Sequence, residues 1–239
     1  MKILAIDTSA KAASAALLEG EKLLGEFYTH SGLTHSQTLM PMVEQLLSCC
    51  QVTLPQIDVM ALSAGPGSFT GLRIGMAAIK GMAFPQNTPC VKVSTLEGLC
   101  YNLPEFSGLL CPVMDARCGQ VYNALFQWKE GSLNRLTPDR AITIPELEEE
   151  LKSCSQPILL LGDGSPLCYQ SMQLHQLSLA GAANRYQRAS GVGLCAYQAA
   201  LRGETLPPDQ LRPDYLRLPQ AQRELMMKKN LEFNGGNPL

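Results

Sequence analysis

The stretch that decides the fold is residues 58–75, DVMALSAGPGSFTGLRIG, where an apolar segment passes through a glycine-rich turn into a helical pattern. Residues 58–64 predict a buried strand, and residues 65–68, GPGS, predict a tight turn. A helix is expected from Thr70 to Phe84. The turn is not a P-loop, because no Gly-Lys-Ser/Thr follows, and Gly71 comes one residue too late for a dinucleotide fingerprint. A strand, a turn and a helix in this order indicate an α/β fold.

The same plan occurs twice along the chain. Each half predicts three strands, a helix, a fourth strand, a glycine turn and a second helix. In the first half the strands are 2–7, 12–19, 22–29 and 58–64, followed by a short strand at 90–93, and the first helix is Ser36–Cys50. In the second half the strands are 109–115, 120–128, 132–137 and 158–161, and the helices are Glu146–Lys152 and Leu167–Leu174.

Both halves have the same residue types at the ends of their strands. Each first strand ends in an aspartate, Asp7 or Asp115, and each fourth strand enters Gly-x-Gly-Ser. We therefore expect a duplicated α/β fold with two similar lobes, residues 1–102 and 103–208. Residues 209–239 are expected to carry a helix near Ala221–Lys229 and a tail, and to return to the first lobe.

Composition excludes several classes of protein. With 46% hydrophobic and 17% charged residues in a chain of 239, a globular core is expected rather than disorder. No apolar run approaches the roughly 20 residues that a membrane span needs. The first apolar run stops at Asp7, which argues against a signal peptide, and nine cysteines without a C-x-x-C pair suit a cytoplasmic chain. Nineteen basic against 21 acidic residues give no excess with which to grip nucleic acid alone.

Two helices suggest a docking surface. The Thr70–Phe84 helix has only two charges, Arg73 and Lys80, and small residues four apart that allow a second helix to approach closely. Met40 and Met42 add apolar surface to the Ser36–Cys50 helix. The alternative is that both helices are buried within this chain. The predicted partner interface consists of His35, Leu39, Met40, Met42, Val43, Leu46, Thr70, Gly71, Ile74, Gly75, Ala77, Ala78 and Gly81.

No catalytic or metal-binding residue is expected. His30 and His35 are five apart and cannot share a metal from one helix face, and the G-x-S-x-G nucleophile motif is absent. The strand ends at Asp7 and Asp115 can face a cleft between the lobes. A vestigial nucleotide site is therefore predicted at Asp7, Thr8, Ser9, Asp115 and Arg117. The turn after Asp7 has no glycine to wrap a phosphate, so structural capping by both aspartates is the alternative reading.

Several motifs in order resemble the TsaB (YeaZ) family. They are Ile3-Leu-Ala-Ile-Asp7-Thr-Ser9, His35-Ser36, residues 65–75, Val93-Ser-Thr-Leu96, Asp115-Ala-Arg117-x-Gly-x-Val-Tyr122 and Pro213-x-Tyr215-Leu-Arg217. The resemblance covers about residues 1–220. It implies the actin-like, Hsp70-like and sugar-kinase-like duplicated fold.

The resemblance also implies a function. The chain is expected to be a cytoplasmic subunit required for threonylcarbamoyladenosine at position 37 of tRNA, serving as dimerisation and scaffold partner of the catalytic TsaD subunit. It implies no enzyme activity of the chain on its own and no cofactor, with ATP or ADP binding left to the complex. A TsaE-like ATPase and a homodimer are further implied partners, and tRNA is met only through the complex.

The catalytic relative carries two histidines four apart for a metal. Here His35 is followed by Leu39 at that spacing, so the metal site is expected to be missing. The competing hypotheses are a small-molecule kinase or ATPase of the same superfold and a metallopeptidase. The first lacks the glycine expected near Thr8–Ala12, and the second lacks its pair of histidines.

Overall fold

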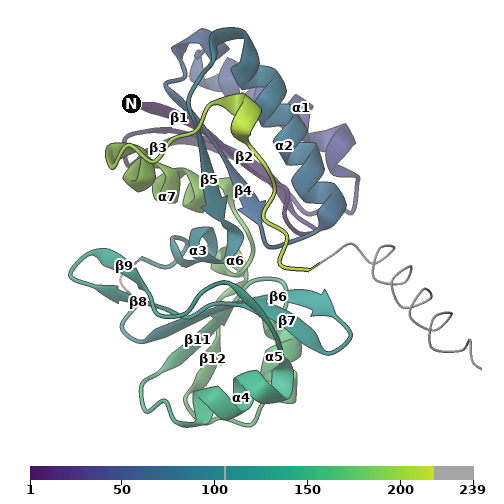
Figure 1. Cartoon of the computed structure of the whole chain (residues 1–239), viewed down its shortest axis with the longest axis vertical. Helices are drawn as coiled ribbons and strands as arrows, with labels where there is room; N and C mark the ends of the chain where they lie inside the picture. The colour runs from purple at the N-terminus through teal and green to yellow at the C-terminus, as the bar shows by residue number, and fades with distance from the viewer. Residues whose placement is uncertain (105, 218–239) are drawn as a thin grey trace, which may run out of the picture.

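The chain folds into two α/β lobes that follow one another along the long axis of the molecule (Figure 1). The computed structural model describes residues 1–104 and 106–217. The first sheet has the order β3-β2-β1-β4-β5, in which β1 pairs antiparallel with β2 and parallel with β4. Its strands are β1 (Lys2–Asp7), β2 (Ala13–Glu19), β3 (Lys22–Thr29), β4 (Val59–Gly65) and β5 (Cys90–Ser94).

The second sheet repeats this topology. Its main path is β10-β7-β6-β11-β12, again with antiparallel pairs on one side of the first strand and parallel pairs on the other. The predicted duplicated α/β fold of the actin-like type is confirmed by this shared strand order. The strands of this path are β6 (Leu109–Arg117), β7 (Gln120–Asn123), β10 (Arg140–Thr143), β11 (Ile158–Leu161) and β12 (Leu177–Leu179).

Helices cover both faces of the first sheet. Helices α1 (His35–Cys50) and α2 (Phe69–Ala83) lie on one face, where Leu39, Val43 and Ile79 join its core. Helix α7 (Ala189–Leu201) covers the other face through Val192 and Ala196. The remaining helices are α3 (Thr95–Cys100), α4 (Ile144–Lys152), α5 (Ser165–Ser171) and α6 (Ala182–Arg185), with short 3-10 turns at Leu54–Gln56, Phe84–Gln86 and Pro208–Gln210.

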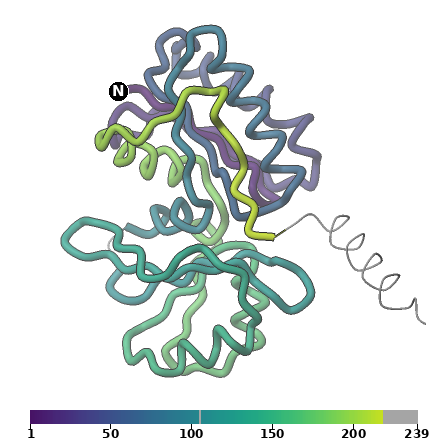
Figure 2. Tube along the Cα trace, viewed as in Figure 1, coloured from purple at the N-terminus to yellow at the C-terminus, as the bar shows by residue number. Residues whose placement is uncertain are grey.

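The lobe boundary differs from the expected one. Residues 103–208 were predicted to form the second lobe, but α7 packs on the first sheet, and Cys90 and Leu206 form a bridge at its edge. The chain thus leaves the second lobe before α7, as its trace shows in Figure 2. Residues 209–217 then run along the first lobe, where Leu211 enters the core and the Asp214 amide donates to the Ala64 carbonyl. The helix expected near residues 221–229 lies outside the described residues.

One predicted strand is interrupted. Residues 120–128 were expected to be continuous, whereas the structure has β7 (Gln120–Asn123) and β8 (Phe126–Lys129), which pairs with β9 (Ser132–Arg135). Both β7 and β8 pair with β6 in one register, and the break lies opposite Pro112, which has no amide hydrogen to donate. The Asn123 side-chain amide instead donates to the Pro112 carbonyl at 3.1 Å. The unpredicted strands β10 and β12 lie at the two edges of this sheet.

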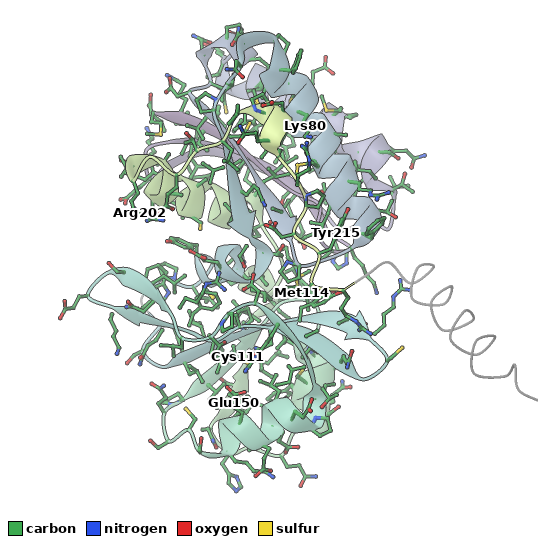
Figure 3. All side chains as sticks on the ribbon, viewed as in Figure 1. Lys80, Cys111, Met114, Glu150, Arg202 and Tyr215 are labelled. Atoms are coloured by element: carbon green, nitrogen blue, oxygen red, sulfur yellow. The ribbon has the colours of Figure 1, made fainter. Side chains whose placement is uncertain are left out.

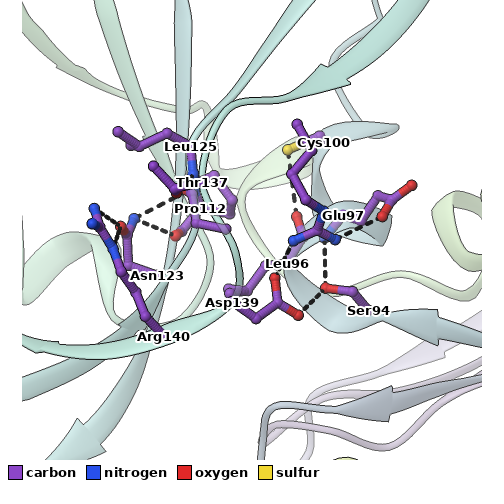
Figure 4. Close-up of polar contacts among 12 residues, drawn as sticks. Ser94, Leu96, Glu97, Cys100, Pro112, Asn123, Leu125, Thr137, Asp139 and Arg140 are labelled. Carbon is purple, nitrogen blue, oxygen red and sulfur yellow. Dashed lines mark hydrogen bonds and ion pairs between the residues drawn. The ribbon is translucent and has the colours of Figure 1, made fainter. Parts of the chain in front are cut away.

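Polar contacts join the lobes around α3 (Figure 4). The Ser94 hydroxyl donates to Asp139 at 2.6 Å, and Arg135 forms ion pairs with Glu97 at 2.7 Å and with Asp139. Apolar residues of α3, including Leu96 and Leu99, pack into a core cluster with β6 and β8. Among the described residues, no helix has both the length and the apolar character to cross a membrane.

Candidate functional site

A cleft of about 370 Å³ opens between the lobes. The two glycine turns and the ends of β1 and β6 bring residues of both lobes to its wall. Ser9, Asp115 and Arg117, three of the five predicted nucleotide-site residues, line this cleft. Asp7 and Thr8 do not line it, because both side chains are buried behind the turn.

Asp7 caps its own turn. Its carboxylate accepts hydrogen bonds from the Ser9 amide at 2.9 Å, from the Ser9 hydroxyl at 2.7 Å and from the Ser63 hydroxyl. Burial raises the pKa of Asp7, while these hydrogen bonds from Ser63 and Ser9 lower it by less. Asp115 accepts from the Arg117 amide at 2.7 Å in the same i to i+2 pattern. Both aspartates therefore have the structural role that the sequence left as an alternative.

The turn after Asp7 is packed against the glycine turn. The Ser68 amide donates to the Ser9 carbonyl at 2.7 Å, and a Cβ on Gly67 would lie 2.5 Å from that same oxygen. Gly67 is thus required for close approach of the two turns.

Other cleft residues were not predicted. Asp163, from the glycine turn of the second lobe, lines the cleft and accepts from the Gln187 side chain at 2.9 Å. Burial raises the pKa of Asp163. The repeated Gly-x-Gly-Ser motif gave a signal for this residue. Lys11, Tyr122, Tyr215 and Arg217 also line the cleft, and only the topology brings them together.

Part of the predicted partner interface is internal. Leu39, Val43 and Leu46 are buried core residues of α1. A Cβ on Gly71 would lie 2.0 Å from the Thr8 carbonyl oxygen, and one on Gly75 would lie 2.4 Å from Thr8 Oγ1. The absence of a side chain at these two glycines therefore lets the β1–β2 turn of the same chain pack against α2. The prediction that the two glycines face a partner was wrong.

The outer side of the helix pair remains accessible. Met40, Thr70, Ala77 and Gly81 are exposed, and His35, Met42, Ile74 and Ala78 are half-buried. A Cβ on Gly81 would meet no atom of residues 1–104 and 106–217 within 4 Å, so the packing of these residues does not require glycine there. We call the exposed or half-buried residues Met40, Thr70, Ile74, Ala77, Ala78 and Gly81 the helix-pair face.

His35 lies beside this face. One of its ring nitrogens, Nε2, is 2.8 Å from the Ala10 carbonyl oxygen, and the ring lines a hollow of about 690 Å³ with His30, Leu33 and Ile74. Leu39, four residues on, points into the core rather than toward the hollow. Within residues 1–104 and 106–217, no group of three His, Cys, Asp or Glu side chains is placed to hold a metal ion.

Known proteins resemble the chain over nearly its whole length. Residues 29–223 match the family model described as TsaD, tRNA N6-adenosine threonylcarbamoyltransferase. The chain is 36% identical to the tRNA threonylcarbamoyladenosine biosynthesis protein TsaB of Bacillus subtilis, over 93% of this chain and 96% of that protein. It is 30% identical to TsaB of Escherichia coli, over 96% of this chain and 100% of the relative.

A solved structure agrees with these sequence matches. The Pseudomonas aeruginosa protein described as similar to peptidase YEAZ superimposes with a TM-score of 0.78 at 27% identity, over 90% of this chain and 99% of that chain. Sequence, fold and extent of the match agree, and the chain belongs to the TsaB (YeaZ) family.

Proposed function

We propose that this chain acts in tRNA threonylcarbamoyladenosine biosynthesis as the dimerisation and scaffold subunit of a catalytic TsaD-type homologue. The names of its relatives and the TsaD family model support the pathway and the partnership. In this proposal the partner transfers the threonylcarbamoyl group to adenosine 37, and the chain presents its helix-pair face to the matching helices of the partner.

Gly81 and its surroundings carry the proposal. The helix-pair face consists mainly of small or apolar side chains, and Gly81 is exposed in a helix where nothing in the described chain approaches it. Glycine in a helix interior costs stability relative to alanine. Close packing of a partner helix against Ala77 and Gly81 explains the glycine at position 81. The α1–α2 pair of this chain and the matching pair of the partner then form a four-helix contact.

The proposed role is non-catalytic. His35 has no second histidine one helical turn away. In the turn after Asp7, the amide and hydroxyl of Ser9 already donate hydrogen bonds to the Asp7 carboxylate. These features support neither a metal-dependent transfer nor the kinase alternative. We further propose that a TsaE-like ATPase joins the cytoplasmic complex, that ATP or ADP binds only there, and that the chain pairs with itself when the catalytic homologue is absent.

Reconstitution with the TsaD-type subunit of the same organism tests the proposal. With an activated threonylcarbamoyl donor, tRNA and the TsaE-like ATPase supplied, we expect no threonylcarbamoyl transfer by the chain alone and turnover once the TsaD-type subunit is added. Ala77→Arg on the helix-pair face should weaken binding of the two subunits about 100-fold, as a desolvated unpaired charge does. Ala141→Arg, on an exposed strand of the second lobe, is the matched control. Turnover by the chain alone, or full affinity of Ala77→Arg, would overturn the proposal.

A further inference from the structure

An arginine beside the helix-pair face contacts a pair of stacked aromatic rings. The rings of Phe69 and Tyr215 are stacked with centroids 4.6 Å apart. The Arg73 guanidinium carbon lies 3.9 Å from the Phe69 centroid, and Arg73 Nε donates to Tyr215 Oη at 3.2 Å. Phe69 and Arg73 are one turn apart on α2, while Tyr215 comes from the far end of the described chain. We call these three residues the anchor cluster.

The segment that brings Tyr215 to α2 is fixed on both sides. The Asp214 amide donates to Ala64, and the Asp214 carboxylate pairs with Lys92 at 2.6 Å. Arg217 then donates to the Ala116 carbonyl of the second lobe at 2.8 Å. Figure 3 shows Tyr215 on this segment between α2 and the second lobe. The anchor cluster is therefore rigid before any ligand arrives, which reduces the entropy lost on binding.

The charge of Arg73 is not neutralised within the described chain. The Arg73 side chain is exposed, and among residues 1–104 and 106–217 its guanidinium forms no ion pair and no hydrogen bond besides that to Tyr215. Its two Nη groups keep their donors available. A planar guanidinium held in this way is suited to take a carboxylate through two parallel hydrogen bonds.

The position of the cluster identifies the partner. Arg73 lies one turn from Ala77 on α2, so a helix that covers Ala77 and Gly81 also takes Arg73 out of water. The sole charged side chains on α1 and α2 are Glu44, Arg73 and Lys80, and an unpaired buried guanidinium is costly. The covering surface must therefore supply an anion within an otherwise apolar helix face. An RNA phosphate suits the place less, because the surrounding helix face is apolar and the whole chain has a net charge of −2, with no basic excess to hold nucleic acid.

We infer that Arg73, oriented by Phe69 and Tyr215, is the charged anchor of this interface and receives an aspartate or glutamate side chain of the TsaD-type homologue. This inference rests on the proposed function, because it takes the occupant of the helix-pair face from it. Arginine and tyrosine are the residue types most enriched at the centres of binding energy in protein interfaces.

Binding measured by calorimetry between the full chain and its TsaD-type subunit tests the inference. Arg73→Ala should weaken binding about 30-fold or more, and Arg73→Lys should recover little, because an ammonium lacks the planar pair of donors. Tyr215→Phe keeps the ring stack and removes the hydroxyl that orients Nε, so it should weaken binding by less. Lys129→Gln removes an exposed charge on β8 of the second lobe, away from α1 and α2, and should bind as the wild type does.

The outcomes separate the two proposals. If the wild type fails to bind the TsaD-type subunit, the proposed function fails. If the wild type binds and Ala77→Arg does not, but Arg73→Ala and Arg73→Lys bind normally, only the anchor is refuted. Loss of self-association or of RNA binding in Arg73→Ala, with binding to the homologue unchanged, would also overturn the anchor. Melting temperatures of all variants show whether any loss comes from unfolding, and Arg73→Lys keeps the test decisive if Arg73→Ala is unstable.

Discussion

Gly75 and Gly81 lie on the same helix, and their surroundings are opposite. Gly75 is buried against Thr8, whereas Gly81 is exposed and a Cβ there would meet nothing within 4 Å in the part of the chain that the structure describes. We expect Gly75→Arg to destabilise the folded monomer by about 3 kcal/mol or more, because the side chain has no room beside a buried turn. The same substitution at Gly81 should not lower the melting temperature, because the side chain can extend into solvent and arginine favours a helix more than glycine does. Thermal unfolding of the two variants side by side checks this, and a stable Gly75→Arg monomer would contradict the observed packing.

The buried carboxyl group of Asp7 should make stability depend on pH. Its pKa is raised in the folded chain by burial, so the folded state holds the proton more tightly than the unfolded state does. Protonated Asp7 therefore contributes to the free energy of unfolding below the unfolded-state pKa of about 4. This contribution is lost as pH rises toward the folded-state pKa. We expect the wild type to lose free energy of unfolding relative to Asp7→Asn as pH increases from about 3.5 to 7. Urea unfolding of both proteins across this range measures the difference, and a difference that stays constant or grows with pH would refute the assignment.

At the scale of a single element, α2 serves two surfaces. Its inner side closes on the β1–β2 turn, and its outer side carries Ala77 and Gly81. Gly81→Ala should stabilise the isolated chain by roughly 0.5–1 kcal/mol through helix propensity. The added methyl group should at the same time weaken binding of the TsaD-type subunit, by about tenfold if the helices are in contact there.

Gly81→Ala is therefore expected to raise the stability of the isolated chain and to lower its affinity for the TsaD-type subunit. Melting temperature and calorimetric affinity measure them on the same sample. Gln170→Ala, on an exposed position of α5 in the second lobe, should leave the affinity unchanged. If Gly81→Ala binds the homologue as tightly as the wild type, close helix contact at Gly81 is excluded.

The predictability of each element depended on how local its signal is. Leu39, Val43 and Leu46 recur at helical spacing, so α1 could be predicted from the sequence. The break between β7 and β8 could not, because it is caused by Pro112 on a neighbouring strand. Helix α7 is rich in Gly and Ala and is buried on most sides, so no polar face gave it a period.

The candidate site shows the same limit. The spacing of Gly71 and Gly75 correctly indicated that something approaches α2 closely, but it could not reveal that this is Thr8 of the same chain. The close approach predicted at Ala77 and Gly81 stays a prediction. Tyr215 lies 142 residues from Arg73, and only the return of the chain to the first lobe brings the two together. Local motifs thus indicated which helices have unusual packing, and the tertiary structure showed which of their residues are buried within the chain.

At the scale of the whole molecule, the first lobe is built from both ends of the described chain. Helix α7 and residues 209–217, which follow the second lobe in the sequence, complete it. The lobes are joined through Ser94 and Asp139, through Arg135 and Glu97, and through Arg217 and Ala116. Tyr215, which hydrogen-bonds Arg73 beside the helix-pair face, therefore belongs to a segment that also contacts the second lobe and lines the interlobe cleft.

The charge of the whole chain bears on its contact with tRNA. A net charge of −2 provides little counterion release, which supplies most of the affinity of proteins for nucleic acid. We expect the isolated chain to bind tRNA weakly, with a slope of log affinity against log salt smaller than about 2 between roughly 50 and 200 mM. The complex with the TsaD-type subunit should bind more tightly and with a steeper slope, since the partner would supply the basic surface. Filter binding of both samples over this salt range measures the two slopes. Tight, strongly salt-dependent binding by the chain alone would show that it contacts tRNA directly, and a basic surface would then have to be sought on the chain itself.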